Sequence, residues 1–129
     1  WSWSRGLGDV YKRQDMGFPT VNLRLNKSIN LAHGIYATNI YFNGHKYGSA
    51  SYFGTRPTFN GDEEFLETYI FDFNDDLYGK SVRVEFIDFI RGDMKFSDNI
   101  ELAKQMEIDC GNVLNKLQNY DKDLSLLEI

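Results

Sequence analysis

The sequence predicts a mainly β domain: an antiparallel β-unit closed by one long C-terminal helix, most simply a small barrel. Segments rich in β-branched and aromatic residues follow one another between Val21 and Ile90, separated by glycine, proline and Asn-Gly turn signals. After Ser97 the apolar residues change to helical spacing, which continues to Leu117. At 129 residues the chain is long enough for one domain with its own core.

The first expected strands form a hairpin. The β-rich pattern begins at Val21. The segments "GIYATNIYF" (Gly34–Phe42) and "KYGSASYF" (Lys46–Phe53) flank Asn43-Gly44, a strong signal for a tight turn. The next segment, "GTRPTFNGD" (Gly54–Asp62), is interrupted by glycine, proline and Asn-Gly, so it predicts a long loop.

Two further strands and the helix follow. Period-two alternation predicts strands over Phe65–Phe73 and Ser81–Ile90. In the first of these, one face is expected to carry Phe65, Glu67, Tyr69, Phe71 and Phe73. Ser97 is the expected N-cap of the final helix. The helix stripe expected to pack on the sheet consists of Leu102, Met106, Cys110, Val113 and Leu117.

The composition excludes several classes of protein. Hydrophobic residues make up 42% of the chain and aromatic residues 16%, which indicates a folded protein rather than a disordered one. The net charge is −5, with no basic block away from the N-terminus, which argues against nucleic acid as a partner. Apolar runs are too short to span a membrane. The single cysteine, Cys110, excludes an internal disulfide and fits the reducing cytoplasm.

The N-terminal segment differs from the rest of the chain. "SRGLGDVYKRQ" (residues 4–14) is similar to the conceptual translation of the adapter used in transposase-based sequencing libraries. We therefore expect Trp1–Gln14 to be an artefact and residues 15–129 to be natural sequence. Without residues 1–14 the chain carries 11 basic and 18 acidic side chains, a net charge of −7.

Thr20 and Asn22 form the first candidate site. They follow Pro19 and lie two residues apart on a segment expected to be extended, so their side chains point to the same side. A hydroxyl and an amide oxygen presented together can complete the coordination shell of Mg²⁺, with water and phosphate oxygens as the other ligands. The alternative is a threonine and an asparagine that simply begin a strand after a proline turn.

Glu67 is the second candidate, because it shares a strand face with four aromatic residues. Burying an ionised carboxylate without a partner costs several kcal/mol, on the order of 5. A carboxylate retained among aromatic residues is therefore often a general base or a salt-bridge partner. The alternative is an exposed strand face on which Glu67 pairs with a basic neighbour.

Five segments together resemble the riboflavin kinase domain. They occur in the family's order and approximate spacing, and the resemblance covers about residues 15–119. The segments are "GFPTVNL", "GIYA", "SYFGTRPTF", "LETYIFDFNDDLYGK" and "FIRGDMKF". The resemblance implies a six-stranded antiparallel Greek-key barrel with a C-terminal helix. It also implies transfer of the ATP γ-phosphoryl group to the 5′-hydroxyl of riboflavin, which gives FMN and ADP.

The resemblance also implies roles for individual residues. Pro19-Thr20-Val21-Asn22 matches the family's Pro-Thr-Ala-Asn signature, with valine in place of alanine. Thr20 and Asn22 would accordingly bind Mg²⁺ and the phosphates of ATP. Glu67 matches the catalytic glutamate that accepts the proton of the attacking hydroxyl. Arg91 would contact the flavin.

Two further contacts with ATP are implied, through Gly17 in the signature corner and through Tyr78 in a turn near the nucleotide. In bacteria the domain commonly forms the C-terminal half of a bifunctional riboflavin kinase/FMN adenylyltransferase, so an adenylyltransferase domain is expected upstream. Family members carry a first strand before Gly17, which the adapter segment replaces here. This truncation leaves open whether the chain is active. A flavin- or nucleotide-binding barrel without catalysis, and an oligonucleotide-binding barrel, are the alternatives, and the acidic charge argues against the latter.

Overall fold

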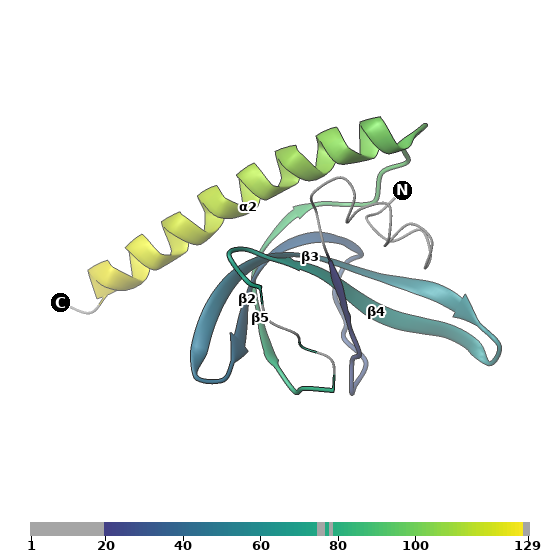
Figure 1. The fold of residues 1–129 in the computed structure, drawn as a ribbon, viewed down its shortest axis with the longest axis horizontal. Coiled ribbons are helices and arrows are strands. Elements are labelled where there is room, and N and C mark those ends of the chain that lie inside the picture. Colours follow the sequence, from purple (N-terminus) through teal and green to yellow (C-terminus); the bar gives the residue numbers. More distant parts are fainter. Residues whose placement is uncertain (1–19, 75–76, 78, 128–129) are drawn as a thin grey trace.

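The computed structural model describes residues 20–74, 77 and 79–127 (Figure 1). Within these residues the chain forms a curved sheet of five strands and one long helix that lies across one face of the sheet. The elements are β1 (Val21–Leu23), β2 (Gly34–Phe42), β3 (His45–Thr58), β4 (Gly61–Ile70), β5 (Arg83–Arg91) and α2 (Asn99–Leu127).

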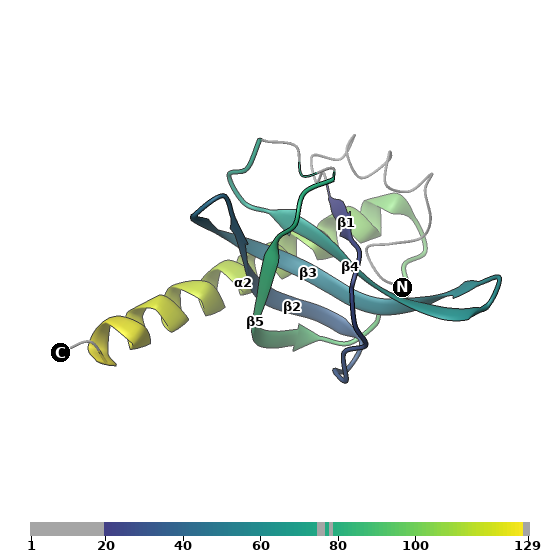
Figure 2. The same cartoon turned by 90° about the horizontal axis from the view of Figure 1, so that it is seen from below.

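All neighbouring strands are antiparallel, in the order β1-β4-β3-β2-β5 (Figure 2). The consecutive strands β2, β3 and β4 form a meander, and β1 and β5 return to its two outer edges, which is a Greek-key arrangement. Among the described residues no hydrogen-bonded ladder joins β1 to β5, so the sheet is not closed. Leu23 of β1 and Val84 of β5 nevertheless pack in the same clusters inside the curve. The predicted antiparallel fold with a C-terminal helix is confirmed.

The two faces of the sheet carry different cores. The outer face packs against α2, and its largest cluster includes Ile35 and Ala50 from the sheet and Leu102 and Met106 from the helix. The inner face is filled by two smaller apolar clusters and by a row of hydroxyl groups. Four fully buried side chains form this hydroxyl row through hydrogen bonds of 2.7–2.8 Å: Thr38, Ser49, Ser51 and Thr68.

The predicted loop over Gly54–Asp62 is wrong. Strand β3 continues to Thr58, and β4 begins at Gly61, so the hairpin turn contains only two residues. Gly61, with a φ of 123°, supplies the backbone conformation that the turn needs. Beyond Phe53, β3 no longer pairs with β2, so Pro57 lies in a two-stranded extension, where proline is tolerated as on an edge strand. This extension projects from the sheet (Figure 1).

The predicted face of Phe65–Phe73 holds only as far as Phe71. Phe65 and Phe71 belong to the cluster beneath α2, whereas Phe73 packs with Phe42 and Tyr47 on the inner face. The reason is that β4 ends at Ile70, and Asp72 has a φ of 55°, which breaks the alternation of the extended chain.

The helix begins one residue later than predicted. Asp98, and not Ser97, is the N-cap, because its carboxylate accepts a hydrogen bond of 2.8 Å from the backbone amide of Glu101. Glu101 in turn accepts hydrogen bonds from the hydroxyl and the amide of Ser97. These two hydrogen bonds hold the pKa of Glu101 below its ordinary value. The pairing resembles a capping box shifted by one residue.

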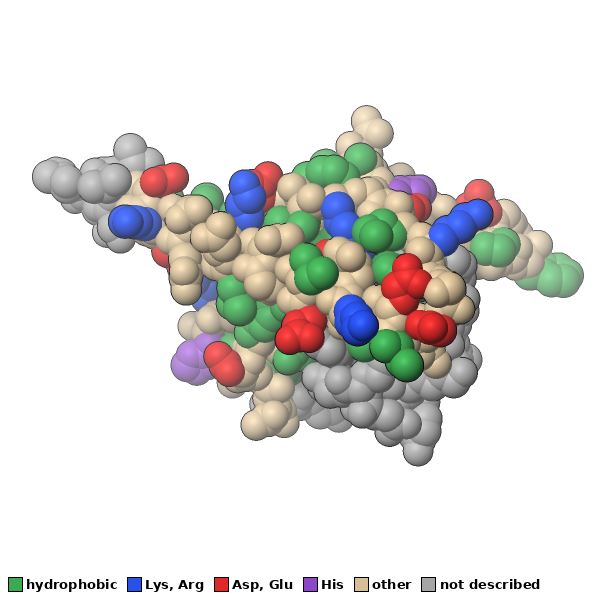
Figure 3. All heavy atoms as spheres, turned by 90° about the horizontal axis from the view of Figure 1, so that it is seen from above, with side chains coloured by type: hydrophobic (Ala, Val, Ile, Leu, Met, Phe, Trp, Pro, Cys, Tyr) green, Lys and Arg blue, Asp and Glu red, His purple; other side chains and the backbone are tan. Residues whose placement is uncertain are grey.

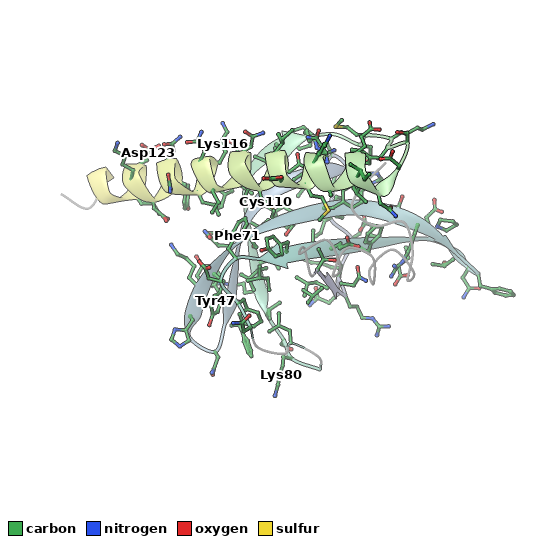
Figure 4. The ribbon with its side chains drawn as sticks, turned by 45° about the horizontal axis from the view of Figure 1, so that its top comes forward. Tyr47, Phe71, Lys80, Cys110, Lys116 and Asp123 are labelled. Atoms are coloured by element: carbon green, nitrogen blue, oxygen red, sulfur yellow. The ribbon has the colours of Figure 1, made fainter. Side chains whose placement is uncertain are left out.

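The predicted packing stripe of the helix is confirmed, since all five of its residues are buried. Figure 4 shows Cys110 on the underside of α2, with Phe71 below it on the sheet. Exposed ion pairs join the later turns of the helix to the sheet: Lys116 to Asp88 at 3.4 Å and Lys46 to Asp121 at 3.3 Å. In the described part of the chain, no helix has the length and apolar character needed to cross a membrane.

Replacing Gly111 with alanine is expected to stabilise the protein by about 0.5–1 kcal/mol. Gly111 lies in the middle of α2 on its exposed side, and a Cβ atom there would meet nothing within 4 Å. The alanine therefore costs no packing and reduces the backbone freedom of the unfolded chain. Urea unfolding monitored by circular dichroism measures the change. A midpoint equal to or below that of the unmodified chain contradicts the prediction.

The thiol of Cys110 is expected to be inert in the folded protein at pH 8. Burial beneath the helix, and secondarily the carboxylate of Asp109, raise the pKa of Cys110 from 9.0 to about 12. The unfolded chain releases this proton at lower pH than the folded chain, so the stabilising contribution is complete below pH 9 and is lost as the pH rises towards 12. Labelling with a thiol reagent before and after unfolding in urea tests the prediction. Rapid labelling of the folded protein contradicts it.

Candidate functional site

Strands β1 and β4 bring the first candidate residues together. Their register places Asn22 directly opposite Glu67, and Val21 opposite Thr68. Directly opposed residues in antiparallel strands share a face, with their Cβ atoms about 4.5–5.5 Å apart. The side chains of Asn22 and Glu67 therefore lie together on the helix-covered face of the sheet, although 45 positions separate them in the sequence.

A single row across this face contains three of the predicted site residues. The pairing continues from Glu67 to Tyr52 on β3, from Tyr52 to Ile35 on β2, and from Ile35 to Arg91 on β5. Because adjacent strands are about 4.8 Å apart, Arg91 lies three strand spacings, or roughly 14 Å along the sheet, from Glu67. The fold thus presents an amide, a carboxylate and a guanidinium in one line.

Glu67 is fully buried. Its neighbours along the same face of β4 are Phe65, which is also buried, and Tyr69, which is partly buried. The alternative of an exposed strand face with a surface ion pair is therefore wrong. A buried carboxylate beside aromatic side chains is an arrangement in which proton transfer can be tuned.

Thr20 is buried immediately before β1, whereas Asn22 is exposed. Among the described residues, no group donates to or accepts from the buried hydroxyl oxygen Oγ1 of Thr20. The described residues contain no cluster of three or more histidine, cysteine, aspartate or glutamate side chains that could hold a metal ion. The oxygens of Thr20 and Asn22 fit the sparse protein shell that Mg²⁺ takes when phosphates and water complete its coordination.

Arg91 is held by the helix. Its Nε donates to Oδ1 of Asp109 at 2.8 Å and its Nη2 donates to Oδ2 at 2.6 Å, a bidentate pair in which Asp109 is almost fully buried. Nη1 donates to the carbonyl oxygen of Gly92, and the guanidinium carbon lies 5.9 Å from the centre of the Phe96 ring. Gln105 donates a further hydrogen bond to Asp109 at 3.0 Å. Arg91 therefore joins β5, the following linker and α2.

Two register shifts in β5 orient this end of the row. They occur between the partners of Ile35 and Tyr36 and between those of Ala37 and Thr38. Each shift places two consecutive β5 residues against one residue of β2, as in a β-bulge. The side chains of Ile90 and Arg91 therefore both contact the helix side of the sheet. The ring of Phe89 packs against Tyr36, with 5.2 Å between the ring centroids.

Gly17 and Tyr78, the other predicted ATP contacts, lie outside the described residues, as does the segment Trp1–Gln14. The residues on either side of Tyr78 are described. Leu77 is buried in an inner-face cluster, and Gly79 has a φ of 73°, which agrees with a turn at this position.

Tyr52 and Asp109 are site neighbours that sequence reasoning missed. Tyr52 is buried opposite Glu67, but its segment offered only a strand pattern. Asp109 carried a usable signal, because it lies between Met106 and Val113 on the apolar stripe of the helix. A carboxylate at such a position predicts a buried cationic partner.

The surface over the helix mixes charges of both signs. Seen from this side, lysine and arginine side chains alternate with aspartate and glutamate among apolar groups (Figure 3). On the described atoms of this face, no continuous basic patch is visible.

The matched family and two curated relatives of similar sequence are all described as riboflavin kinases. The chain matches the family described as "Flavokinase: Riboflavin kinase" over residues 8–117. It is 39% identical over 95 residues to a bifunctional riboflavin kinase/FMN adenylyltransferase of Haemophilus influenzae, covering 73% of this chain and 31% of that protein. It is 34% identical over 111 residues to the protein of the same description in Bacillus subtilis, covering 83% of this chain and 35% of that protein. The chain thus spans about a third of these relatives.

A similar solved structure comes from Streptococcus pneumoniae and is described as a macrolide-efflux protein. It superposes with a TM-score of 0.75 and 32% sequence identity, over 88% of this chain and 37% of that one. Its description differs from those of the sequence relatives. The family match covers most of the chain and the curated relatives share one description, so the sequence comparisons decide between the two.

Proposed function

The chain belongs to the riboflavin kinase family, and from this premise we propose that it transfers the γ-phosphoryl group of ATP to the ribityl 5′-hydroxyl of riboflavin, giving FMN and ADP. The main structural support for the proposal is the buried carboxylate of Glu67, which lies directly opposite Asn22. Thr20 lies two residues before Asn22 in the chain. Phosphoryl transfer depends mainly on positioning and charge neutralisation, so a compact set of oxygen ligands and one base is sufficient.

Glu67 is the proposed general base. The 5′-hydroxyl oxygen forms the new bond to the γ-phosphorus, the bond from this phosphorus to the bridging oxygen of ADP breaks, and the hydroxyl proton passes to Glu67. Burial among aromatic residues supports this role, because it keeps bulk water away from the carboxylate.

Thr20 and Asn22 are the proposed protein ligands of Mg²⁺ and of the ATP phosphates. The buried hydroxyl of Thr20 and the exposed amide of Asn22 are the oxygen donors available beside Glu67 on β1. When bound, Mg²⁺ neutralises negative charge on the phosphates. The residues themselves orient the phosphates towards the carboxylate.

The remaining site assignments follow from the family. We assign Arg91 to the flavin, since it lies on the same row as Glu67 but roughly 14 Å along the sheet, which suits the part of riboflavin away from the reacting hydroxyl. Gly17 and Tyr78 are assigned to ATP. An FMN adenylyltransferase domain is the proposed upstream neighbour, as in the descriptions of the relatives.

We further propose that residues 15–129 are a riboflavin kinase domain without its first strand and that Trp1–Gln14 are adapter-derived. The family match begins at residue 8, so residues 8–14 belong both to the match and to the proposed adapter segment, and the origin of this segment needs a direct test. Uninterrupted DNA sequence upstream of the codon for Asp15 tests the assignment: a different native segment supports it, and the sequence "SRGLGDVYKRQ" in uninterrupted genomic DNA overturns it.

The function is tested by incubating the protein with riboflavin, ATP and Mg²⁺ and separating FMN by chromatography. The 129-residue chain and a chain with its native upstream residues restored are assayed in parallel. ATP- and Mg²⁺-dependent FMN formation by the restored chain is the expected result, with loss in the presence of EDTA. Equilibrium binding of flavin without FMN formation by either chain favours instead a binding barrel without catalysis.

A further inference from the structure

We propose that Tyr52 is a positioning residue for the Glu67 carboxylate and that glycine is needed at position 54 because the ring of Tyr52 occupies the space of a side chain there. The inference deepens the proposed function and rests on it. The two strands supply the starting point: Tyr52 lies directly opposite Glu67, and Gly54 lies directly opposite Phe65. All four residues share the face beneath α2.

Gly54 accommodates the tyrosine by having no side chain. A Cβ atom at this position would lie 2.5 Å from Oη, 2.6 Å from Cε2 and 2.8 Å from Cζ of Tyr52. Gly54 is not among the glycines with positive φ, so its backbone does not require glycine. The requirement is therefore space: the outer part of the Tyr52 ring lies along the strand over Gly54.

The ring is fixed in this orientation by its surroundings. Tyr52 is 6% exposed, and its ring centroid lies 5.7 Å from that of Phe65, which is also buried. On the same face of β3, the residue on the other side of Tyr52 is Ala50. Tyr52 is thus the one large side chain between Gly48 and Gly54 on this face of β3. It lies beside Glu67, which is the one carboxylate in the buried part of β4.

This geometry gives the ring a mechanical role. Asn22 flanks Glu67 on the β1 side, and Tyr52 flanks it on the β3 side. A ring that lies towards Gly54 forms one wall of the site and fixes the space available to the carboxylate. A side chain at Gly54 pushes the ring back towards Glu67, and removal of the ring leaves that wall open. Both changes displace the general base, and misplacement on the scale of 1 Å costs about 100-fold in rate.

The test combines turnover, stability and a direct measurement on Glu67. In the chain with restored upstream residues, Gly54→Ala and Tyr52→Ala are each expected to lower kcat by about 10- to 100-fold with little change in the KM for ATP. Tyr52→Phe keeps the ring and is expected to lose much less kcat than Tyr52→Ala. Gly48→Ala is the matched control, because its Cβ would meet only Leu117 and Phe71 side-chain atoms, at 2.9 and 3.6 Å, away from Tyr52.

Two measurements decide the inference even if the chain makes no FMN. In urea unfolding, Gly54→Ala is expected to destabilise the unmodified chain and to cost much less in the Tyr52→Ala background. In ¹³C NMR at one fixed pH, the chemical shift of the Glu67 carboxyl carbon, assigned with Glu67→Gln, is expected to change in Gly54→Ala and to stay unchanged in Gly48→Ala. Equal costs of Gly54→Ala in both backgrounds, or an unchanged Glu67 chemical shift in Gly54→Ala, overturn the proposal. Absence of FMN with both expected results preserved overturns only the proposed function.

Discussion

Replacing Glu67 with glutamine is expected to lower kcat for FMN formation by about 10²- to 10⁴-fold, the range that general-base catalysis supplies. The amide has nearly the shape of the carboxylate but cannot accept the proton of the 5′-hydroxyl. Because Glu67 is fully buried opposite Asn22, the substitution also removes a charge from the proposed phosphate site. Initial rates with the restored chain, together with circular dichroism and a thermal midpoint for each protein, separate catalysis from folding.

Glu63→Gln is the matched control for this prediction. Glu63 lies on the same face of the same strand, but its side chain is 47% exposed and pairs with Arg56 at 3.5 Å in the projecting hairpin. Its replacement is expected to leave kcat unchanged. If Glu67→Gln retains the turnover of the Glu63→Gln protein, Glu67 is not the base.

Separating Arg91 from Asp109 is expected to produce the largest loss of stability, about 3–5 kcal/mol for either Arg91→Ala or Asp109→Ala. The bidentate pair is nearly enclosed, with side chains 15% and 1% exposed, so each single substitution leaves the other charge buried without its partner. Urea unfolding measures the change. A double replacement, Arg91→Met with Asp109→Leu, is expected to be less destabilising than either single change, because it leaves no buried charge.

Lys116→Ala provides the comparison for this pair. It removes an ion pair between the same two elements, with Asp88 at 3.4 Å, but both side chains are about half exposed, at 49% and 46%. A loss of about 0–1 kcal/mol is expected. Equal losses for Lys116→Ala and Arg91→Ala contradict the view that burial makes the Arg91–Asp109 pair important.

Local patterns predicted much of the fold. Strand β2 has the predicted bounds because six of its nine residues are β-branched or aromatic and Asn43-Gly44 ends it. The buried stripe of α2 follows from its spacing. The sequence did not predict the hairpin extension, because Gly54, Pro57 and Gly61 are each typical of turns. In the structure only Gly61 forms the turn. Gly54 makes room for the ring of Tyr52, and Pro57 is tolerated because no third strand pairs with β3 at that position.

The candidate site was predictable residue by residue but not as an arrangement. Thr20, Asn22 and Glu67 stand out by residue type and by resemblance, yet their adjacency depends on pairing β1 with β4 across the meander. That pairing is a long-range property that no local pattern contains. The ion pair between Arg91 and Asp109 likewise joins residues 18 positions apart on β5 and α2, a contact that no strand or helix pattern contains.

The hydroxyl row on the inner face has a consequence for the accuracy of assembly. Ser51 and Thr68 are partners across β3 and β4, and Glu67 precedes Thr68 in the same strand with its side chain on the other face. If β4 slipped by one residue, Thr68 would leave its buried partner and the Glu67 carboxylate would turn to the inner face, away from Asn22 and Tyr52. Both errors carry a high free-energy cost. The hydrogen bonds of the hydroxyl row thus favour the native register of β3 and β4, and this register places the Glu67 carboxylate on the same face as Asn22.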